Sequence, residues 1–416
     1  MRFGIFYEHQ LPKPWADGDE EKLLNDAIEQ VVLADKLGLD NVWAVEHHFL
    51  DEYSHSSAPE VFLAACAART EQIRIGHGIK HTPAPYNHPA RVAEEIATLD
   101  LISRGRVEFG IGEGATRHEL GGFGVPAKQK RDMSLEAGRE IANMMAMEPY
   151  PGYEGESFSM PCRNVLPKPS QKPHPPMWIA CTNRKTIEVA AENGLGALAF
   201  SFVDPAEAEH WVQTYYDIIK SDRCVPLGHT VNANIALVTG FSLHEDREIA
   251  IRRGRESFEF FRYAISAMVT LDQTPGRTTL WEDFVRKAGP NAVEGYLEKA
   301  RSYGDRYSSA IGNPADARRH IRELAATGVD QLIFIQQAGR NQHEHICESL
   351  ELFADQVMPE FQAGEAERVA AKEAELAPYI EAALARREWM SPLPEEEIPV
   401  IPAAVRVAQV PRAAVS

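Results

Sequence analysis

The sequence has few of the features that mark several large classes of protein. Its 416 residues include only five cysteines, and no two of them are spaced as Cys-x-x-Cys. That pattern indicates neither a zinc ribbon nor a disulfide framework. No uninterrupted apolar run approaches the ~20 residues that cross a bilayer. The N-terminus also lacks the apolar region and cleavage site of a signal peptide. We therefore expect a reduced, cytoplasmic protein with no membrane partner.

An excess of basic residues is also missing. Lys and Arg number 43 against 61 Asp and Glu, which gives a net charge of −18 at pH 7. Proteins that bind nucleic acids usually present a basic face, so we expect no nucleic-acid partner. Hydrophobic residues make up 44% and charged residues 25%, as in an ordinary globular protein. The length suits one large α/β barrel or two modest domains.

Short apolar segments alternate with segments of helical periodicity along the chain. The apolar segments predict strands at 2–7, 39–45, 73–79, 106–112, 176–180, 196–200, 232–241 and 331–336. This alternation predicts a parallel sheet with helices outside it. Eight such units favour a TIM (β/α)8 barrel, and an open doubly wound sheet is the alternative.

Several segments exceed what a minimal barrel needs. A Gly-rich loop at 113–128 follows the fourth strand, and Pro-rich residues 149–176 are expected to lie extended on the surface. A partly helical insertion at about 242–312 follows the seventh strand. We predict a barrel domain at 1–360 and a C-terminal extension at 361–416. The extension contains an Ala/Glu-rich helix and a Pro-rich tail.

Polar residues follow several predicted strands, at the end where TIM barrels have their active sites. Glu46, His47 and His48 end the second strand in the segment EHHF. An imidazole suits proton transfer near neutral pH, whereas ordinary loop histidines are the simpler alternative. Adjacent residues on a strand point to opposite faces, so this pair is not spaced to bind one ion. We therefore predict no metal site.

Two further segments are candidate ligand-binding loops. Residues 110–124, GIGEGATRHELGGFG, lack the helix that a dinucleotide fingerprint requires, so we interpret them as a loop that lets a flat ring approach the backbone. The segment CTNRKT at 181–186 links a strand to a helix. Its hydroxyls, backbone N–H groups and helix end favour a phosphate. Thr182 or Asn183 acting as a helix N-cap is the alternative.

These landmarks, in this order, resemble the bacterial luciferase-like, flavin-dependent monooxygenases. The resemblance extends to about residue 360 and rests on EHHF, on NHPARVAEEIATLDLISRGRVEFGIG and on PPMWIACTNRKTIEVAAENGLGAL. It implies that reduced FMN lies across the barrel mouth and reacts with O₂ to give a C4a-(hydro)peroxide. A separate flavin reductase would supply the FMNH₂.

The resemblance also implies roles for particular residues. His47 would handle a proton beside the flavin, tuned by Glu46, with His48 as its neighbour. The peptide between Gly78 and Ile79 would be a non-prolyl cis bond beneath the ring.

The phosphate ligands implied by the resemblance are Thr182, Asn183 and Thr186. Luciferase itself has a Cys-Arg pair in the loop after the fourth strand, where this chain has Gly112 and Glu113. A carboxylate cannot neutralise a phosphate, so Arg117 or Arg184 is expected to supply the positive charge. The same departure indicates an activity other than light emission.

The predicted function is therefore a two-component monooxygenase that inserts one oxygen atom into a small apolar organic substrate. We expect a homodimer or a higher homo-oligomer. The insertion is a candidate lid, and its aromatic residues would either line a substrate pocket or pack the insertion's own core. These residues are Phe258, Phe260, Phe261 and Tyr263. The alternatives are F420-dependent hydride transfer within the same superfamily and a non-catalytic flavin-binding protein.

Overall fold

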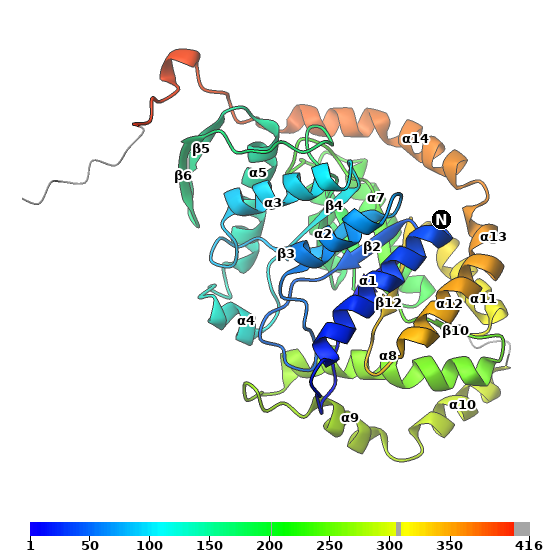
Figure 1. Cartoon of the computed structure of the whole chain (residues 1–416). Helices are drawn as coiled ribbons and strands as arrows, with labels where there is room; N and C mark the ends of the chain where they lie inside the picture. Colours follow the sequence, from blue (N-terminus) through cyan, green and yellow to red (C-terminus); the bar gives the residue numbers. More distant parts are fainter. Residues whose placement is uncertain (201, 305–308, 403–416) are drawn as a thin grey trace, which may run out of the picture.

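Eight parallel strands close into a barrel in the computed structural model, which describes residues 1–200, 202–304 and 309–402 (Figure 1). Around the barrel the strand order is β1-β12-β9-β8-β7-β4-β3-β2. The strands are β1 (Arg2–Tyr7), β2 (Asn41–Ala44), β3 (Arg74–His81), β4 (Val107–Gly112), β7 (Met177–Cys181), β8 (Gly196–Ala199), β9 (Ile235–Thr239) and β12 (Gln331–Gln336). The predicted TIM barrel is confirmed, and the open sheet is wrong.

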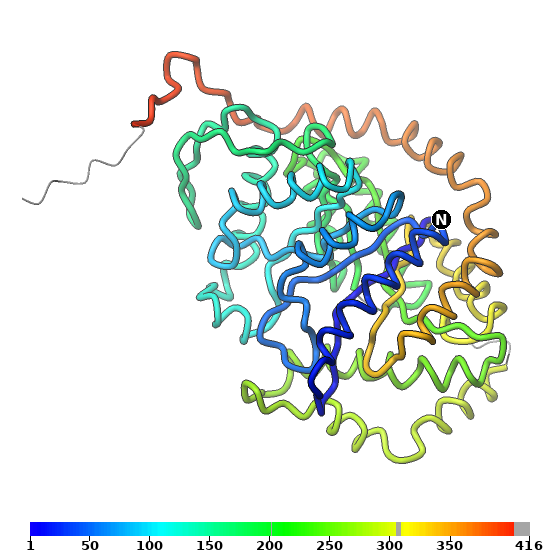
Figure 2. Tube along the Cα trace, viewed as in Figure 1, coloured from blue at the N-terminus to red at the C-terminus, as the bar shows by residue number. Residues whose placement is uncertain are grey.

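Helices surround the barrel, and each follows the periodicity seen in the sequence. They are α1 (Asp19–Leu37), α2 (Pro59–Arg69), α3 (Pro89–Ile102), α5 (Lys130–Ala146), α6 (Arg184–Glu192), α7 (Pro205–Ile219), α11 (Pro314–Ala325) and α12 (His343–Gln356). Gly38 ends α1 with a φ of 83°, which favours glycine, and Pro89 begins α3. Figure 2 shows the two ends of the barrel sequence meeting, with α1 beside α12. Within the described residues, none of the helices combines the length and hydrophobicity needed to cross a bilayer.

Alternation along the strands gives the barrel an apolar interior. The interior cluster comprises Phe6, Trp43, Val45, Ile79, Trp178, Leu198, Ala236, Val238, Ile333 and Ile335. Successive side chains on a strand point to opposite faces, so residues two or four positions apart share a face. Glu8 comes two residues after Phe6, His47 comes four after Trp43, and His81 comes two after Ile79. The chain thus directs these three polar residues toward the mouth.

Glycines let β3 and β4 approach closely near this mouth. The register between the two strands shifts between His77 and Lys80. A Cβ at Gly110 would lie 2.2 Å from the backbone oxygen of His77, and one at Gly112 would lie 2.2 Å from Cδ1 of Ile79. A larger residue at Gly110 would therefore push the strands apart, whereas one at Gly112 would displace the Ile79 side chain.

Two segments have more structure than the sequence predicted. The Pro-rich stretch contains an antiparallel hairpin, β5 (Tyr150–Glu154) and β6 (Ser159–Arg163), where we expected extended chain. The Gly-rich loop contains the short helix α4 (Arg117–Gly122), capped by the Thr116 side chain. A six-residue helix is too short to show a periodic apolar stripe, so no pattern in the sequence predicts it.

The insertion after β9 is helical and covers one end of the barrel. Its parts are β10 (Ser242–Leu243), α8 (Arg247–Thr270), α9 (Leu280–Ala288), α10 (Ala292–Tyr303) and β11 (Ile311–Gly312). Figure 1 shows α8 lying along this end, with α9 and α10 outside it. The two short strands pair in parallel and close the insertion at its base.

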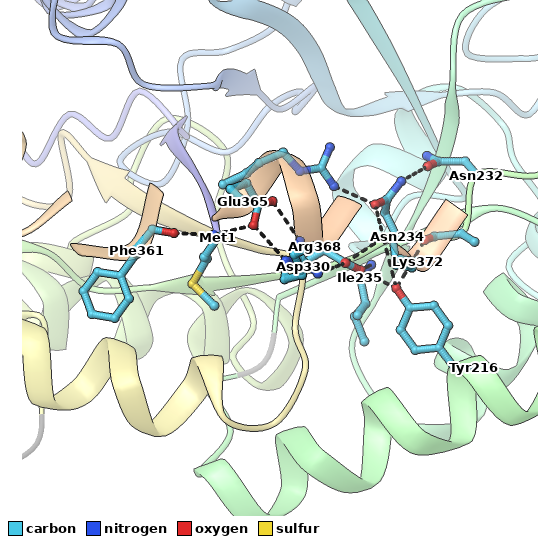
Figure 3. Close-up of polar contacts among 12 residues, drawn as sticks. Met1, Tyr216, Asn232, Asn234, Ile235, Asp330, Phe361, Glu365, Arg368 and Lys372 are labelled. Carbon is cyan, nitrogen blue, oxygen red and sulfur yellow. Dashed lines mark hydrogen bonds and ion pairs between the residues drawn. The ribbon is translucent and has the colours of Figure 1, made fainter. Parts of the chain in front are cut away.

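The C-terminal extension wraps the barrel with α13 (Met358–Gln362) and α14 (Glu365–Arg386). Figure 3 shows how α14 is fixed: Lys372 Nζ lies 2.6 Å from Oδ1 of the fully buried Asp330, and Arg368 lies 3.1 Å from the same oxygen. Asp330 immediately precedes β12, so these contacts lie at the end of the barrel opposite the mouth. Residues 403–416 of the predicted tail lie outside the described residues.

Candidate functional site

His47 lies between two carboxylates at the C-terminal ends of the strands. Its Nδ1 is 2.8 Å from Oε1 of Glu119, and its Nε2 is 3.5 Å from Oε2 of Glu8. Glu8 directly follows β1, whereas Glu119 is supplied by α4 in the loop after β4. The structure thus brings together three segments that are distant in sequence. Reasoning from the sequence missed both carboxylates.

The two carboxylates determine the charge of His47. Burial alone would lower the pKa of His47, but the charges of Glu119 and Glu8 raise it to about 9. Burial raises the pKa of Glu8 to about 7, although the neighbouring His47 opposes this. Burial also acts to raise the pKa of Glu119, but His47 lowers it to about 2. Both neighbouring carboxylates therefore favour the protonated form of the His47 ring.

Glu46 has a different partner from the one predicted. Its Oε1 lies 3.1 Å from Nε2 of His48, and its Oε2 accepts a 2.6 Å hydrogen bond from the backbone N–H of His81. Burial acts to raise the pKa of Glu46, but the His48 hydrogen bond and the charge of Lys80 lower it to about 2. Glu46 therefore binds His48 directly and makes only a minor contribution to the pKa of His47.

The described residues contain two groups of three side chains with the geometry of metal ligands. Glu46, His48 and His81 form one group, and His47, His81 and Glu119 form the other, with ligand atoms within 4.8 Å of one another. The adjacent histidines fall into separate groups, as the alternation of strand residues implies. Each group contains a direct contact between an imidazole and a carboxylate, His48 with Glu46 and His47 with Glu119. The absence of a metal stays a prediction.

Tyr53 connects this centre to the insertion. Its hydroxyl donates a 2.7 Å hydrogen bond to Oε1 of Glu8. Its ring centroid lies 5.5 Å from that of His47 and 6.1 Å from that of Phe261 on α8. The insertion therefore contacts the site directly.

The aromatic stretch on α8 is divided between the barrel and the insertion's own core. Phe258 and Phe261 pack with the interior cluster of the barrel and with Phe202. Phe260 and Tyr263 instead pack against α9. One pair of rings thus faces the mouth and the other builds the insertion's own core.

The start of α6 is a complete capping box. Asn183 Oδ1 accepts a 3.1 Å hydrogen bond from the backbone N–H of Thr186. The Thr186 hydroxyl accepts hydrogen bonds from the backbone N–H groups of Thr182 and Asn183, at 2.9 and 3.1 Å. The N-cap interpretation is confirmed for Asn183. The same residues remain close enough to this helix end to contact an anion.

The positive charge near this helix end comes from residues that the sequence did not single out. Lys130 Nζ and Arg131 Nε lie 3.1 and 2.8 Å from the carboxylate of Glu113. Arg131 also interacts electrostatically with Cys181, the last residue of β7. The only sequence signal for these two cations is their place at the start of a helix after the Gly-rich loop.

Arg117 and Arg184, which were predicted to supply this positive charge, are less well placed to bind a phosphate. Arg184 forms a two-point contact with Glu207 on α7, at 2.7 and 2.5 Å. Arg117 is exposed at the start of α4, the helix that brings Glu119 to His47. Arg184 would have to leave Glu207 before it could bind a phosphate.

The peptide between Gly78 and Ile79 is cis, as the resemblance implied. Several buried polar atoms at the C-terminal ends of the strands or in the loops that follow them have no hydrogen-bond partner. They include Oε2 of Glu8, Nε2 of Gln10, Nδ1 of His81 and the hydroxyl of Tyr86. Buried polar atoms normally find partners, and the interior cluster beneath them is apolar. A flat ring with polar edges, such as a flavin, fits this combination.

Residues 1–331 match the family model described as luciferase-like monooxygenase. This chain belongs to the luciferase-like monooxygenase family. The enzyme class predicted from the sequence, a flavin-dependent monooxygenase, is thereby confirmed.

Two relatives illustrate this membership. The chain is 35% identical over 276 residues to the uncharacterized protein y4wF of Sinorhizobium fredii, covering 62% of this chain and 74% of that one. It is 30% identical over 199 residues to the oxygenase component of the flavin-dependent trigonelline monooxygenase of Acinetobacter baylyi. This second match covers 47% of this chain and 52% of that protein, about half of each.

Solved structures share the fold. Monooxygenase RslO1 from Streptomyces bottropensis superposes with a TM-score of 0.69 at 24% identity, covering 87% of this chain and all of that one. The oxygenating constituent of 3,6-diketocamphane monooxygenase from Pseudomonas putida, in complex with FMN, gives 0.65 at 20%, with 86% and 98% covered. An F420-dependent secondary alcohol dehydrogenase gives 0.62 at 16%, with 86% and 98% covered.

Proposed function

We propose that this chain is the oxygenase component of a two-component monooxygenase. It binds FMNH₂ delivered by a separate reductase and inserts one atom of O₂ into a small apolar organic substrate. The observation that carries the proposal is the set of unpartnered buried polar atoms around His47, above an apolar interior. When bound, the reduced flavin supplies the electrons that activate O₂.

The flavin ring would lie over the Gly78–Ile79 peptide and beside Gly112, with the Ile79 side chain packed against Gly112. Its phosphate would bind at the start of α6, where Thr182, Asn183 and Thr186 lie. Lys130 and Arg131 would supply the positive charge, with Arg117 and Arg184 as more distant cations. Glu113 already holds the first two cations in place, so it would give up part of its contact when a phosphate arrives.

The protein's own groups would then orient the reactants and control protons. His47 is a charged donor that can stabilise negative charge on a bound reactant. Glu46 holds His48 and the backbone of His81, which fixes the wall beside it. Phe258 and Phe261 give the mouth an apolar side that excludes water and suits an apolar substrate.

Flavin binding and oxygen transfer can be tested separately. The protein is titrated with FMNH₂ under anaerobic conditions and then exposed to ¹⁸O₂ with a flavin reductase, NADH and panels of ketones, terpenes and aromatics. We expect tight FMNH₂ binding and one labelled oxygen in a product. Hydride transfer with a preference for F420 would support the first alternative, and flavin binding without any oxygenated product would support the second.

The proposed setting is the cytoplasm and the proposed assembly is a homodimer or a higher homo-oligomer. Large apolar side chains are exposed on neighbouring helices: Val61 on α2 is 67% exposed, and Leu101 on α3 is 47% exposed. Exposed apolar residues of this size favour contact with another subunit. Light scattering coupled to size-exclusion chromatography measures the assembly, and a monomer at micromolar concentration would contradict it.

A further inference from the structure

Glu8 is a buried carboxylate that the family resemblance did not single out. It is 2% exposed and lies on the inner face directly beyond β1. One of its oxygens accepts the Tyr53 hydroxyl, whereas the other has no hydrogen-bond partner and faces Nε2 of His47 at 3.5 Å. A carboxylate is rarely buried without a partner that compensates its charge.

The charged groups that face the two ring nitrogens of His47 can be identified. Glu119 faces Nδ1 from α4, and Glu8 faces Nε2 from the end of β1. His81 at the end of β3 lies 6.1 Å away between ring centroids, and burial lowers its pKa to about 4, so it adds no charge. Glu46 is bound to His48 on the other side of the loop. His47 therefore has a carboxylate at each ring nitrogen.

We propose that Glu8 is a positioning residue that acts with Glu119 to hold His47 as an imidazolium with both ring nitrogens protonated. A neutral imidazole has one donor nitrogen and one acceptor nitrogen, so it could satisfy only one of two carboxylates. An imidazolium donates its Nδ1 proton to Glu119 and turns a second N–H toward the unpartnered Oε2 of Glu8, at 3.5 Å between Nε2 and Oε2. The site then presents a fixed positive charge to a bound reactant, whereas the sequence predicted only a proton-handling residue at this position. The role in the reaction rests on the proposed function, but the protonation state does not.

The protonation state can be measured on the flavin-free protein. Long-range ¹H–¹⁵N correlation spectra of protein labelled at histidine report which ring nitrogens carry protons, and the His47 signals are assigned by their loss in H47Q. We expect both nitrogens to be protonated at pH 7.5. A neutral His47 ring at that pH would overturn the proposal. The protonation state is measured on the unaltered protein, and H47Q serves only to assign the signals.

The contribution of Glu8 is isolated by substitution. An opposite charge within ~4–6 Å shifts a pKa by about 1–3 units, so E8Q should lower the His47 titration midpoint by about one unit or more. E119Q should lower it further because Glu119 is closer. Y53F removes a contact to Glu8 but leaves both carboxylates, so its midpoint should stay within about half a unit of that of the unaltered protein.

The matched control is E20Q. Glu20 contacts a different histidine, His55, at 2.8 Å and is 72% exposed, so its loss should leave the His47 midpoint unchanged. An E8Q midpoint equal to that of the unaltered protein would overturn the proposal. Failure to bind FMNH₂ would refute the proposed function and leave this titration result standing.

Discussion

The chemistry of His47 follows from what lies at each of its ring nitrogens. The sequence identified the residue as a proton-handling group, but that prediction considered only the neighbouring residues of the EHH triplet. In the structure its charge is determined by Glu119 and Glu8, which no local pattern connects to it. Glu46, its neighbour in sequence, turns to His48. Glu46 and His47 have different partners because successive side chains near a strand end point to opposite sides.

Removing the imidazole should separate cofactor binding from chemistry. H47A should keep FMNH₂ affinity within about threefold, since the ring would be held mainly by backbone and by the phosphate site. Product formed per NADH consumed should fall by about tenfold or more, because one directed charged donor contributes roughly 10²–10³ in rate at such sites. The comparison is H55A, a loop histidine of the same segment, and equal coupling in both variants would contradict the role of His47.

The same residue should give stability a pH dependence above neutrality. Its pKa is raised to about 9 from 6.5, so its contribution is complete below pH 6.5 and is lost as pH rises through 9. Urea unfolding between pH 7 and 9.5 should show a fall of up to about 3 kcal/mol, because each pKa unit corresponds to about 1.4 kcal/mol. H47Q should flatten this fall and H55Q should keep it. A fall that persists in H47Q would rule out His47 as its source.

At the scale of elements, the predicted strands agree with the observed ones to within a few residues. Apolar runs and glycine or proline boundaries are local signals, so they identify β1 and β12 without tertiary information. The hairpin β5–β6 was missed because its proline residues suggested irregular chain. The helix α4 was missed because six residues show no period.

The carboxylate of Glu52 joins the insertion to the loop between β2 and α2. Glu52, which is fully buried, accepts hydrogen bonds from the backbone N–H groups of Leu280 and Trp281 at 2.6 and 3.1 Å, and from that of Lys13 at 3.1 Å. Leu280 and Trp281 are the first two residues of α9, and a carboxylate is favourable at the N-terminus of a helix. Glu52 therefore fixes the lid candidate beside Tyr53.

Loss of this charge should loosen α9. In E52Q the backbone amides of Leu280 and Trp281 should exchange hydrogen about tenfold faster or more, because a hydrogen bond to a charged group contributes about 1.5–3 kcal/mol. Hydrogen-exchange mass spectrometry of residues 280–288 measures this. The control is E282Q, an exposed glutamate on the same helix. Similar protection in E52Q and in the unaltered protein would mean that α9 is held by its apolar contacts alone.

At the scale of the whole molecule, the two ends of the barrel have different tasks. The C-terminal ends carry the polar mouth and the insertion, and the opposite end is covered by α14. Asp330 is the centre of that second face, where Lys372 and Arg368 approach one oxygen and the backbone N–H of Ile235 donates to the other at 3.0 Å. Burial acts to raise the pKa of Asp330, but Lys372 keeps it below its usual value.

Neutralising Asp330 should destabilise the molecule without altering the mouth. D330N leaves a half-buried lysine without its counter-charge, and breaking such a pair costs about 3–5 kcal/mol. Urea or thermal unfolding should show this loss, whereas D355N, on the exposed side of α12, should show almost none. The His47 titration should be the same in both variants. An unchanged unfolding midpoint in D330N would mean that α14 contributes little to stability.

The sequence alone predicted the barrel, the polar residues at the strand ends and the cis peptide between Gly78 and Ile79 in β3, because periodicity, caps and ordered landmarks are properties of neighbouring residues. Only the tertiary structure decided the charge of His47, the partner of Glu46 and the cations beside Glu113. Those properties depend on distances between segments far apart in the chain, and electrostatic interactions follow distance and burial rather than sequence order.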